Sequence, residues 1–349
     1  MPKQVPKALV VLALASLVPT LVVAQTKKLT LEAIFDQGLS ATDVSEITWM
    51  PDGRLAYFKE AEEAADGETD GEADSEADSE SGPDLWAVDL TTGASEILVS
   101  ATELDEMAPT PDDIDEREKT RRSRFEVSAY HFSPDGSQIL FTSSGQVVLY
   151  HLADKAATVL APSKKNVLDP KFSPDGQTIA FVADHDIWAV PVSGGAPRQL
   201  TTGGHELLLH GDLDWVYPEE FGVRTGYHFS PDSRHIAFLE MDQSSVSTHP
   251  ITEELAWQAT VDLQRYPQPG TPNPRVRVGI VNLETARTVW LDRAAEYIPR
   301  IDWADSSHVA VQLLDRRQEA LELVLADPAS GRSRSVFFEK DPYWVDVTD

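Results

Sequence analysis

Three copies of one short phrase decide the fold: Phe132-Ser133-Pro134-Asp135-Gly136, Phe172-Ser173-Pro174-Asp175-Gly176 and Phe229-Ser230-Pro231-Asp232-Ser233. Proline fixes φ at the first corner of a turn, aspartate caps the turn through its side chain, and glycine accepts a positive φ. A short apolar run follows each copy, for example Ile139-Leu140-Phe141. The phrase therefore predicts a tight turn between two strands of a hairpin.

A second phrase recurs at a short distance, as Asp84–Leu90 and again as Asp186–Val192, each closed by a Gly-containing turn. Pro134 and Pro174 lie 40 residues apart, which is the length of one four-stranded propeller blade. We therefore predict an all-β fold, a β-propeller. A β-sandwich with recurring hairpins is the alternative, but it would not repeat the same two phrases in order.

Two segments interrupt these repeats. Residues 59–84 hold twelve acidic residues and almost no apolar side chain, so they cannot offset the entropy of ordering and are expected to be a disordered acidic insertion. Residues 111–124 are strongly charged and can begin with a helix cap.

The composition excludes several classes of function. A net charge of −29 argues against nucleic acid as a partner, because phosphates require a basic face. The chain has no cysteine, so disulfides and cysteine-ligated metals are excluded, and we expect no metal site and no cofactor.

The N-terminus has the pattern of a secretory signal peptide. Lys3 and Lys7 precede an apolar run over residues 8–23, and small residues lead to Ala24. A membrane anchor is the alternative, but the run is short and contains Pro19. We expect residues 1–24 to be removed and residues 25–349 to be exported, to the periplasm or the extracellular space.

The most specific stretch is Asp214-Trp215-Val216-Tyr217-Pro218-Glu219-Glu220-Phe221, which is followed at once by the third copy of the turn phrase. Further on come Met241-Asp242-Gln243 and the Pro-rich segment Arg265–Pro274. These residues closely resemble the N-terminal β-propeller of the dipeptidyl peptidase IV family of serine peptidases. The resemblance is strong over residues 214–285 and looser over the rest of residues 30–349.

The resemblance implies a binding site for the substrate. In the family a short helical insertion carries two glutamates that bind the N-terminal ammonium of a peptide, and Glu219 and Glu220 match them. An arginine that lies near the substrate backbone in the family matches Arg124 by region only. Asp214, Trp215 and Tyr217 are expected to shape the motif. Pro218 departs from the family pattern, but proline is compatible with a first helical turn, so the glutamates should fall near the start of a helix.

The resemblance also shows what the sequence lacks. The family propeller has eight blades, whereas the repeats here indicate an incomplete set of about five to seven. No Gly-x-Ser-x-Gly elbow is present, so we predict no catalytic residue and no C-terminal α/β-hydrolase domain.

Three hypotheses follow. The chain is a fragment of a dipeptidyl peptidase and is inactive alone, or it is a subunit completed by a hydrolase domain in a longer or split product. Alternatively, it is a non-catalytic exported propeller of the TolB or WD40-like type that binds peptides or proteins. A homodimer is compatible with the family resemblance.

Overall fold

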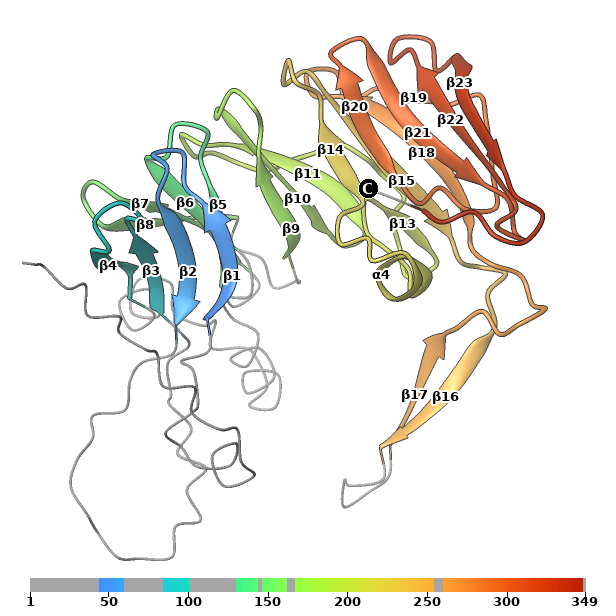
Figure 1. Cartoon of the computed structure of the whole chain (residues 1–349), viewed down its shortest axis with the longest axis horizontal. Coiled ribbons are helices and arrows are strands. Elements are labelled where there is room, and N and C mark those ends of the chain that lie inside the picture. Colours follow the sequence, from blue (N-terminus) through green and yellow to red (C-terminus); the bar gives the residue numbers. More distant parts are fainter. Residues whose placement is uncertain are drawn as a thin grey trace, which may run out of the picture. The chain divides into compact units, whose positions relative to one another are not determined.

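The structure is a computed structural model that describes residues 44–59, 84–100, 130–143, 146–161, 167–253 and 260–347 (Figure 1). The predicted signal peptide, the interior of the predicted acidic insertion and the charged segment that contains Arg124 lie outside these residues. Within the described part of the chain, no helix is both long and apolar enough to cross a bilayer.

The described residues form successive antiparallel sheets, each built mainly from consecutive strands. The first sheet has the strands β1 (Val44–Trp49), β2 (Leu55–Lys59), β3 (Asp84–Val88) and β4 (Ser95–Val99). The second has β5 (Tyr130–Phe132), β6 (Gln138–Ser143), β7 (Gln146–His151) and β8 (Ala156–Ala161). The third has β9 (Val167–Phe172), β10 (Thr178–Ala183), β11 (Asp186–Pro191) and β12 (Arg198–Gln199).

The fourth sheet departs from this simple order. It contains β13 (Leu208–His210), β14 (Tyr227–Phe229), β15 (His235–Asp242), β18 (Arg275–Asn282) and β19 (Thr288–Trp290). Both β13 and β14 pair with β15, and the helix α4 (Val216–Glu220) lies in the segment between them (Figure 1). Between β15 and β18 the chain forms a separate hairpin of β16 (Thr248–Glu253) and β17 (Thr260–Arg265).

The fifth sheet is again a simple meander. Its strands are β20 (Ile301–Asp305), β21 (His308–Leu314), β22 (Ala320–Ala326) and β23 (Ser333–Lys340). The weaker copy of the turn phrase at residues 303–306 covers the end of β20 and the first residue of the turn to β21.

The second, third and fourth sheets are buried on two faces, each against a different neighbour. On β6, Ile139 and Phe141 belong to a core shared with the first sheet, whereas Leu140 belongs to a core shared with the third. Cores of the same kind join the third sheet to the fourth and the fourth to the fifth. Because side chains alternate along a strand, such two-sided burial needs apolar residues at consecutive positions. A two-layer sandwich would bury only one face of each sheet, so the cores agree with the propeller prediction.

The repeated turns owe their stability to a serine and an aspartate. In the third sheet the Oγ of Ser173 donates to Oδ1 of Asp175 at 2.6 Å and accepts from the backbone N–H of Thr178 at 3.0 Å. Asp175 also accepts from the N–H of Gln177 at 3.0 Å. The same pairing of serine and aspartate recurs at Ser133 and at Ser230. All three serines are buried, which explains why the phrase keeps serine before proline.

We predict that Ser173→Ala lowers the free energy of unfolding by about 1–3 kcal/mol, because the half-buried N–H of Thr178 loses its side-chain acceptor. Urea unfolding measures the change. Ser193→Ala is the matched control, since Ser193 is exposed in a turn of the same sheet. Equal unfolding midpoints for the two variants would contradict this account of the turn.

Candidate functional site

The helix α4 lies on a loop whose two ends meet. A Cβ on Gly226 would lie 2.3 Å from the carbonyl oxygen of Gly211, so only glycine allows the chain to leave and re-enter the sheet at one point. The N–H of Gly211 donates to the carbonyl of Leu239 at 2.8 Å, and the N–H of Leu239 donates to the carbonyl of Gly226 at 2.9 Å. Both ends of the loop are therefore fixed to β15.

The predicted glutamates lie at the end of α4. The helix has five residues, with Pro218 in its first turn, and Gly222 follows it with φ at +64°. Glu219 therefore lies in the first turn, near the start of the helix as the sequence predicts, and because the helix is so short Glu219 and Glu220 are also its last two residues. Both side chains are exposed, and neither carboxylate forms an ion pair or a hydrogen bond with another described residue.

The opposite face of α4 is anchored. Val216 and Tyr217 are buried, and the hydroxyl of Tyr217 accepts a hydrogen bond from the backbone N–H of Ile298 at 2.9 Å. Nη1 of Arg300 donates to the carbonyl of Phe221 at 3.2 Å, directly after the helix. The loop that leads into the fifth sheet thus holds α4 and leaves the glutamates facing solvent.

Asp214 and Trp215 fix the approach to the helix. Asp214 is buried, and this burial raises the pKa of its carboxyl to about 6, although the backbone N–H groups of Val216 and Tyr217 favour the charged form. The Trp215 ring packs edge-on against Tyr266, with 4.5 Å between ring centroids. Tyr266 belongs to the Pro-rich segment that the sequence singled out, so the structure brings the two most specific stretches together.

The Pro-rich segment Arg265–Pro274 also contacts the residues that hold the C-terminal end of α4. Nδ2 of Asn273 donates to Oε1 of Glu296 at 2.9 Å and to the hydroxyl of Tyr297 at 2.8 Å. The Tyr297 ring in turn contacts Phe221, with 5.3 Å between ring centroids.

A buried polar cluster lies just before the loop. Nδ1 of His210 lies 2.6 Å from Oδ1 of Asp186, and its Nε2 lies 3.0 Å from Oε2 of Glu240. All three side chains are less than 10% exposed. Thr201 donates to the same Asp186 oxygen at 2.7 Å, and Arg277 bonds to the other oxygen of Glu240. The cluster joins the third sheet to the fourth.

Electrostatics favours a protonated His210. Burial opposes the charged imidazolium, but the hydrogen bonds to Glu240 and Asp186 outweigh it and raise the pKa of His210 above its ordinary value. Burial also opposes a charged Glu240, yet the bonds from His210 and Arg277 lower the pKa of that carboxyl. A second histidine pair lies close by in sequence: His185, next to Asp186, is 2.8 Å from Asp212, two residues after His210.

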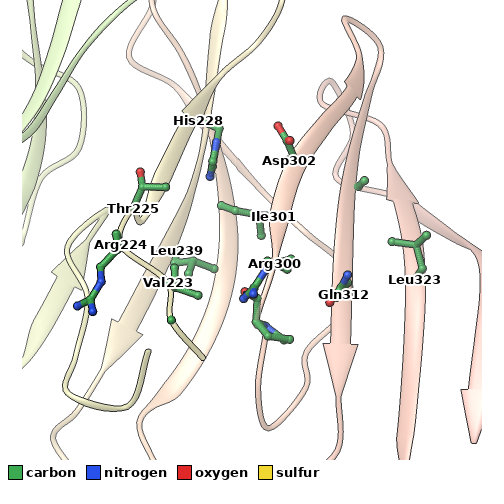
Figure 2. A pocket seen from close by; sticks show the side chains of 13 residues that line it. Val223, Arg224, Thr225, His228, Leu239, Arg300, Ile301, Asp302, Gln312 and Leu323 are labelled. Carbon is green, nitrogen blue, oxygen red and sulfur yellow. The ribbon is translucent and has the colours of Figure 1, made fainter. Parts of the chain in front are cut away.

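A pocket of about 440 Å³ opens beside the loop, between the fourth and fifth sheets. Residues 222–225, directly after α4, form one wall, and Ile301 and Gln312 lie on the opposite side (Figure 2). Sequence reasoning did not find this pocket or the His210 cluster. For the cluster, the signals were Asp186, which begins the otherwise apolar strand β11, and Glu240, which follows the apolar run 236–239 of β15.

The predicted site residues stand as follows. Glu219, Glu220, Asp214, Trp215 and Tyr217 lie on or directly beside α4. Arg124 lies outside the described residues, so its place relative to α4 remains a prediction. Within the described ranges, no group of three or more histidine and carboxylate side chains could hold a metal ion.

Successive four-stranded antiparallel sheets with shared cores define an all-β chain of the kind that forms part of a propeller. The chain belongs to the dipeptidyl peptidase IV (DPP IV) N-terminal region family, whose model matches residues 133–349.

The chain is similar to several proteins that are named as dipeptidyl peptidases. A probable dipeptidyl peptidase 4 of Emericella nidulans is 28% identical over 246 residues, which is 62% of this chain and 31% of the relative. One from Aspergillus fumigatus is 31% identical over 192 residues, 51% of this chain and 25% of the relative. The crystal structure of Porphyromonas gingivalis dipeptidyl peptidase 4 matches 92% of this chain and 43% of its own, with a TM-score of 0.70 and 24% identity. This chain thus spans between a quarter and somewhat under half of the length of these relatives.

We predict that His210→Gln destabilises the chain by about 3–5 kcal/mol near pH 6, because two buried carboxylates lose the cation between them. The raised pKa of His210 means that its charge stabilises the fold fully below about pH 6.5, the ordinary histidine value. This contribution is lost as the pH rises through the folded-state pKa.

Urea unfolding at several pH values between 5.5 and 9 measures the difference between wild type and variant. The difference should shrink toward high pH, while the variant His249→Gln, an exposed histidine of the β16–β17 hairpin, should behave as wild type. A difference that stays constant over this range would contradict a charged His210.

Proposed function

We propose that this chain is the substrate-binding propeller portion of an exported dipeptidyl peptidase IV-like serine peptidase. Glu219 and Glu220 bind the N-terminal ammonium of a peptide. The complete enzyme releases dipeptides from peptide N-termini. An α/β-hydrolase domain in a longer or a split product supplies the catalysis.

One observation carries the proposal: two adjacent carboxylates are exposed and unpaired among the described residues, on a helix whose other face is anchored. Two neighbouring glutamates on a surface are usually just solvated. Here, however, the loop that carries the helix is anchored by hydrogen bonds at both ends and by the buried Tyr217 beneath the helix. Because the backbone that carries the pair is already anchored, only the two side chains have to be ordered when a ligand binds, which favours a binding role.

The chemistry of the pair fits an ammonium group. A protonated amine has three N–H donors, and two carboxylates can accept them as charge-assisted hydrogen bonds. A clamp on the free N-terminus counts residues from that end, which is how a dipeptide is measured. The proposal further includes removal of residues 1–24 as a signal peptide, location in the periplasm or outside the cell, Arg124 as a contact to the peptide backbone, and a homodimer.

We predict that the double variant Glu219→Gln/Glu220→Gln binds the tripeptide Ala-Pro-Ala at least about tenfold more weakly than wild type, because each lost charge-assisted bond is worth about 1.5–3 kcal/mol. Isothermal titration calorimetry measures the affinity. N-acetylation of the peptide should cause a similar loss in wild type, since it removes the ammonium.

The control Glu284→Gln/Glu339→Gln removes two exposed glutamates elsewhere and should keep wild-type affinity. If the α4 variant binds as wild type does, the ammonium clamp is wrong, and a non-catalytic propeller that recognises peptides or proteins by another surface becomes the better account.

A further inference from the structure

Asp214 is a buried acid directly before α4, and its carboxylate is only partly compensated. The residue is 6% exposed. The backbone N–H groups of Val216 and Tyr217, in the first turn of α4, favour its charged form. Its Oδ1, in contrast, is buried and forms no hydrogen bond with another described residue. A carboxylate in such a place carries a free-energy cost that either a proton or a nearby cation removes.

The strand behind Asp214 does not supply that cation. Sδ of Met241 on β15 accepts a hydrogen bond from the backbone N–H of Asp214 at 3.3 Å. The charged neighbour of Met241 on this strand is Glu240, which is already bonded to His210 and Arg277. The described contacts on this side are therefore neutral or already paired.

The helix and the segment 296–298 meet Asp214 through Tyr217. Burial raises the pKa of the Tyr217 hydroxyl well above its ordinary value, and the charges of Asp214, Tyr297 and Glu296 act in the same direction. Tyr217 therefore stays neutral at every pH at which a carboxyl titrates. Within the loop itself the other aspartate, Asp212, is paired with His185. Asp214 is thus the buried acid of this loop that has no cationic partner among the described residues.

We propose that Asp214 is a positioning residue that couples protons to peptide binding: an ammonium on Glu219 and Glu220 favours ionised Asp214, so that binding releases the proton of Asp214 to solvent. This inference rests on the proposed ammonium clamp. The glutamates follow Asp214 by five and six residues, which is about 7–9 Å along a helix that rises about 1.5 Å per residue. Opposite unit charges about 10 Å apart, at an effective dielectric constant of about 20, favour each other roughly tenfold.

The direction of the pH dependence follows from the burial of Asp214, which raises the pKa of its carboxyl to about 6. Near pH 5 the free chain holds Asp214 mostly protonated, and a bound ammonium has to displace that proton. Near pH 7 the carboxylate is already charged and attracts the ammonium fully. With a tenfold coupling, the affinity rises about fivefold from pH 5 to pH 7, and binding at pH 5.5 releases about half a proton.

The effect on folding has the opposite sign. A carboxyl whose pKa is raised in the folded chain stabilises the fold fully below its ordinary value of 3.8. This contribution is lost as the pH rises through about 6. Asp214 therefore lowers stability at the pH at which it strengthens binding, which is a reason for a binding role rather than a purely structural one.

The test is isothermal titration calorimetry of the full chain with Ala-Pro-Ala at pH 5, 6 and 7. At pH 5.5 the titration is repeated in two buffers of different ionisation enthalpy, because the difference in heat counts the protons released. The peptide amine is mostly protonated throughout, since its pKa is about 7.7–8.0. We expect the fivefold rise in affinity and the release of about half a proton in wild type.

Asp214→Asn keeps the shape of the neutral acid and removes its charge. It should bind within about twofold of wild type at pH 5, about tenfold more weakly at pH 7, and release no proton at pH 5.5. His210 is the same in both chains, so the difference between them belongs to Asp214. The matched control is Asp154→Asn, an exposed aspartate that accepts the N–H of Ala156 at 3.3 Å and should keep wild-type behaviour.

The outcomes separate this inference from the clamp. Binding that needs Glu219 and Glu220 but releases no proton at pH 5.5 would overturn the role of Asp214 and leave the clamp intact; this measurement uses wild type, so it holds even if Asp214→Asn folds poorly. Equal proton release by wild type and Asp214→Asn would also overturn it, because another group would then titrate. If Glu219→Gln/Glu220→Gln binds the peptide as wild type does, the clamp and the inference fail together.

Discussion

The interaction on which the candidate site depends is the buried imidazole of His210 between Asp186 and Glu240. A buried carboxylate is costly unless a cation or several donors compensate it. The carboxylate of Asp186 accepts hydrogen bonds from the side chains of His210, Thr201 and Gln199 and from the N–H of Gly204. The carboxylate of Glu240 accepts hydrogen bonds from His210 and Arg277. Because His210 ends β13, this cluster fixes the point from which the α4 loop departs, and it ties that point to the third sheet.

The loop is held equally firmly at its far side. Tyr217 and Phe221 contact the segment 297–300, which leads into the fifth sheet. The loop therefore connects three successive sheets, and its exposed end carries Glu219 and Glu220. A rigid support of this kind suits a polar binding site, since a backbone that is already ordered loses little further entropy on binding. The pocket of about 440 Å³ lies against the same loop.

Much of the fold follows from local sequence. The Ser-Pro-Asp-Gly phrase predicts its turns because the hydrogen bonds that stabilise them span only two to five residues. The helix at Glu219 follows from the resemblance, although its ending with the glutamates does not, because Gly222 rather than Pro218 sets its length. The His210 cluster was not predictable in this way: its partners lie 24 and 30 residues from His210 and meet only when the sheets pack. The pocket likewise needs three-dimensional packing, since its walls come from residues 222 to 323.

The most direct test of the account is a crystal structure of the chain with a bound tripeptide that has a free N-terminus, such as Ala-Pro-Ala. The account predicts that the ammonium nitrogen lies within about 2.7–3.2 Å of carboxylate oxygens of both Glu219 and Glu220, with α4 and its contacts to Ile298 and Phe221 unchanged. A peptide bound with its ammonium in solvent, or on other carboxylates, would contradict it.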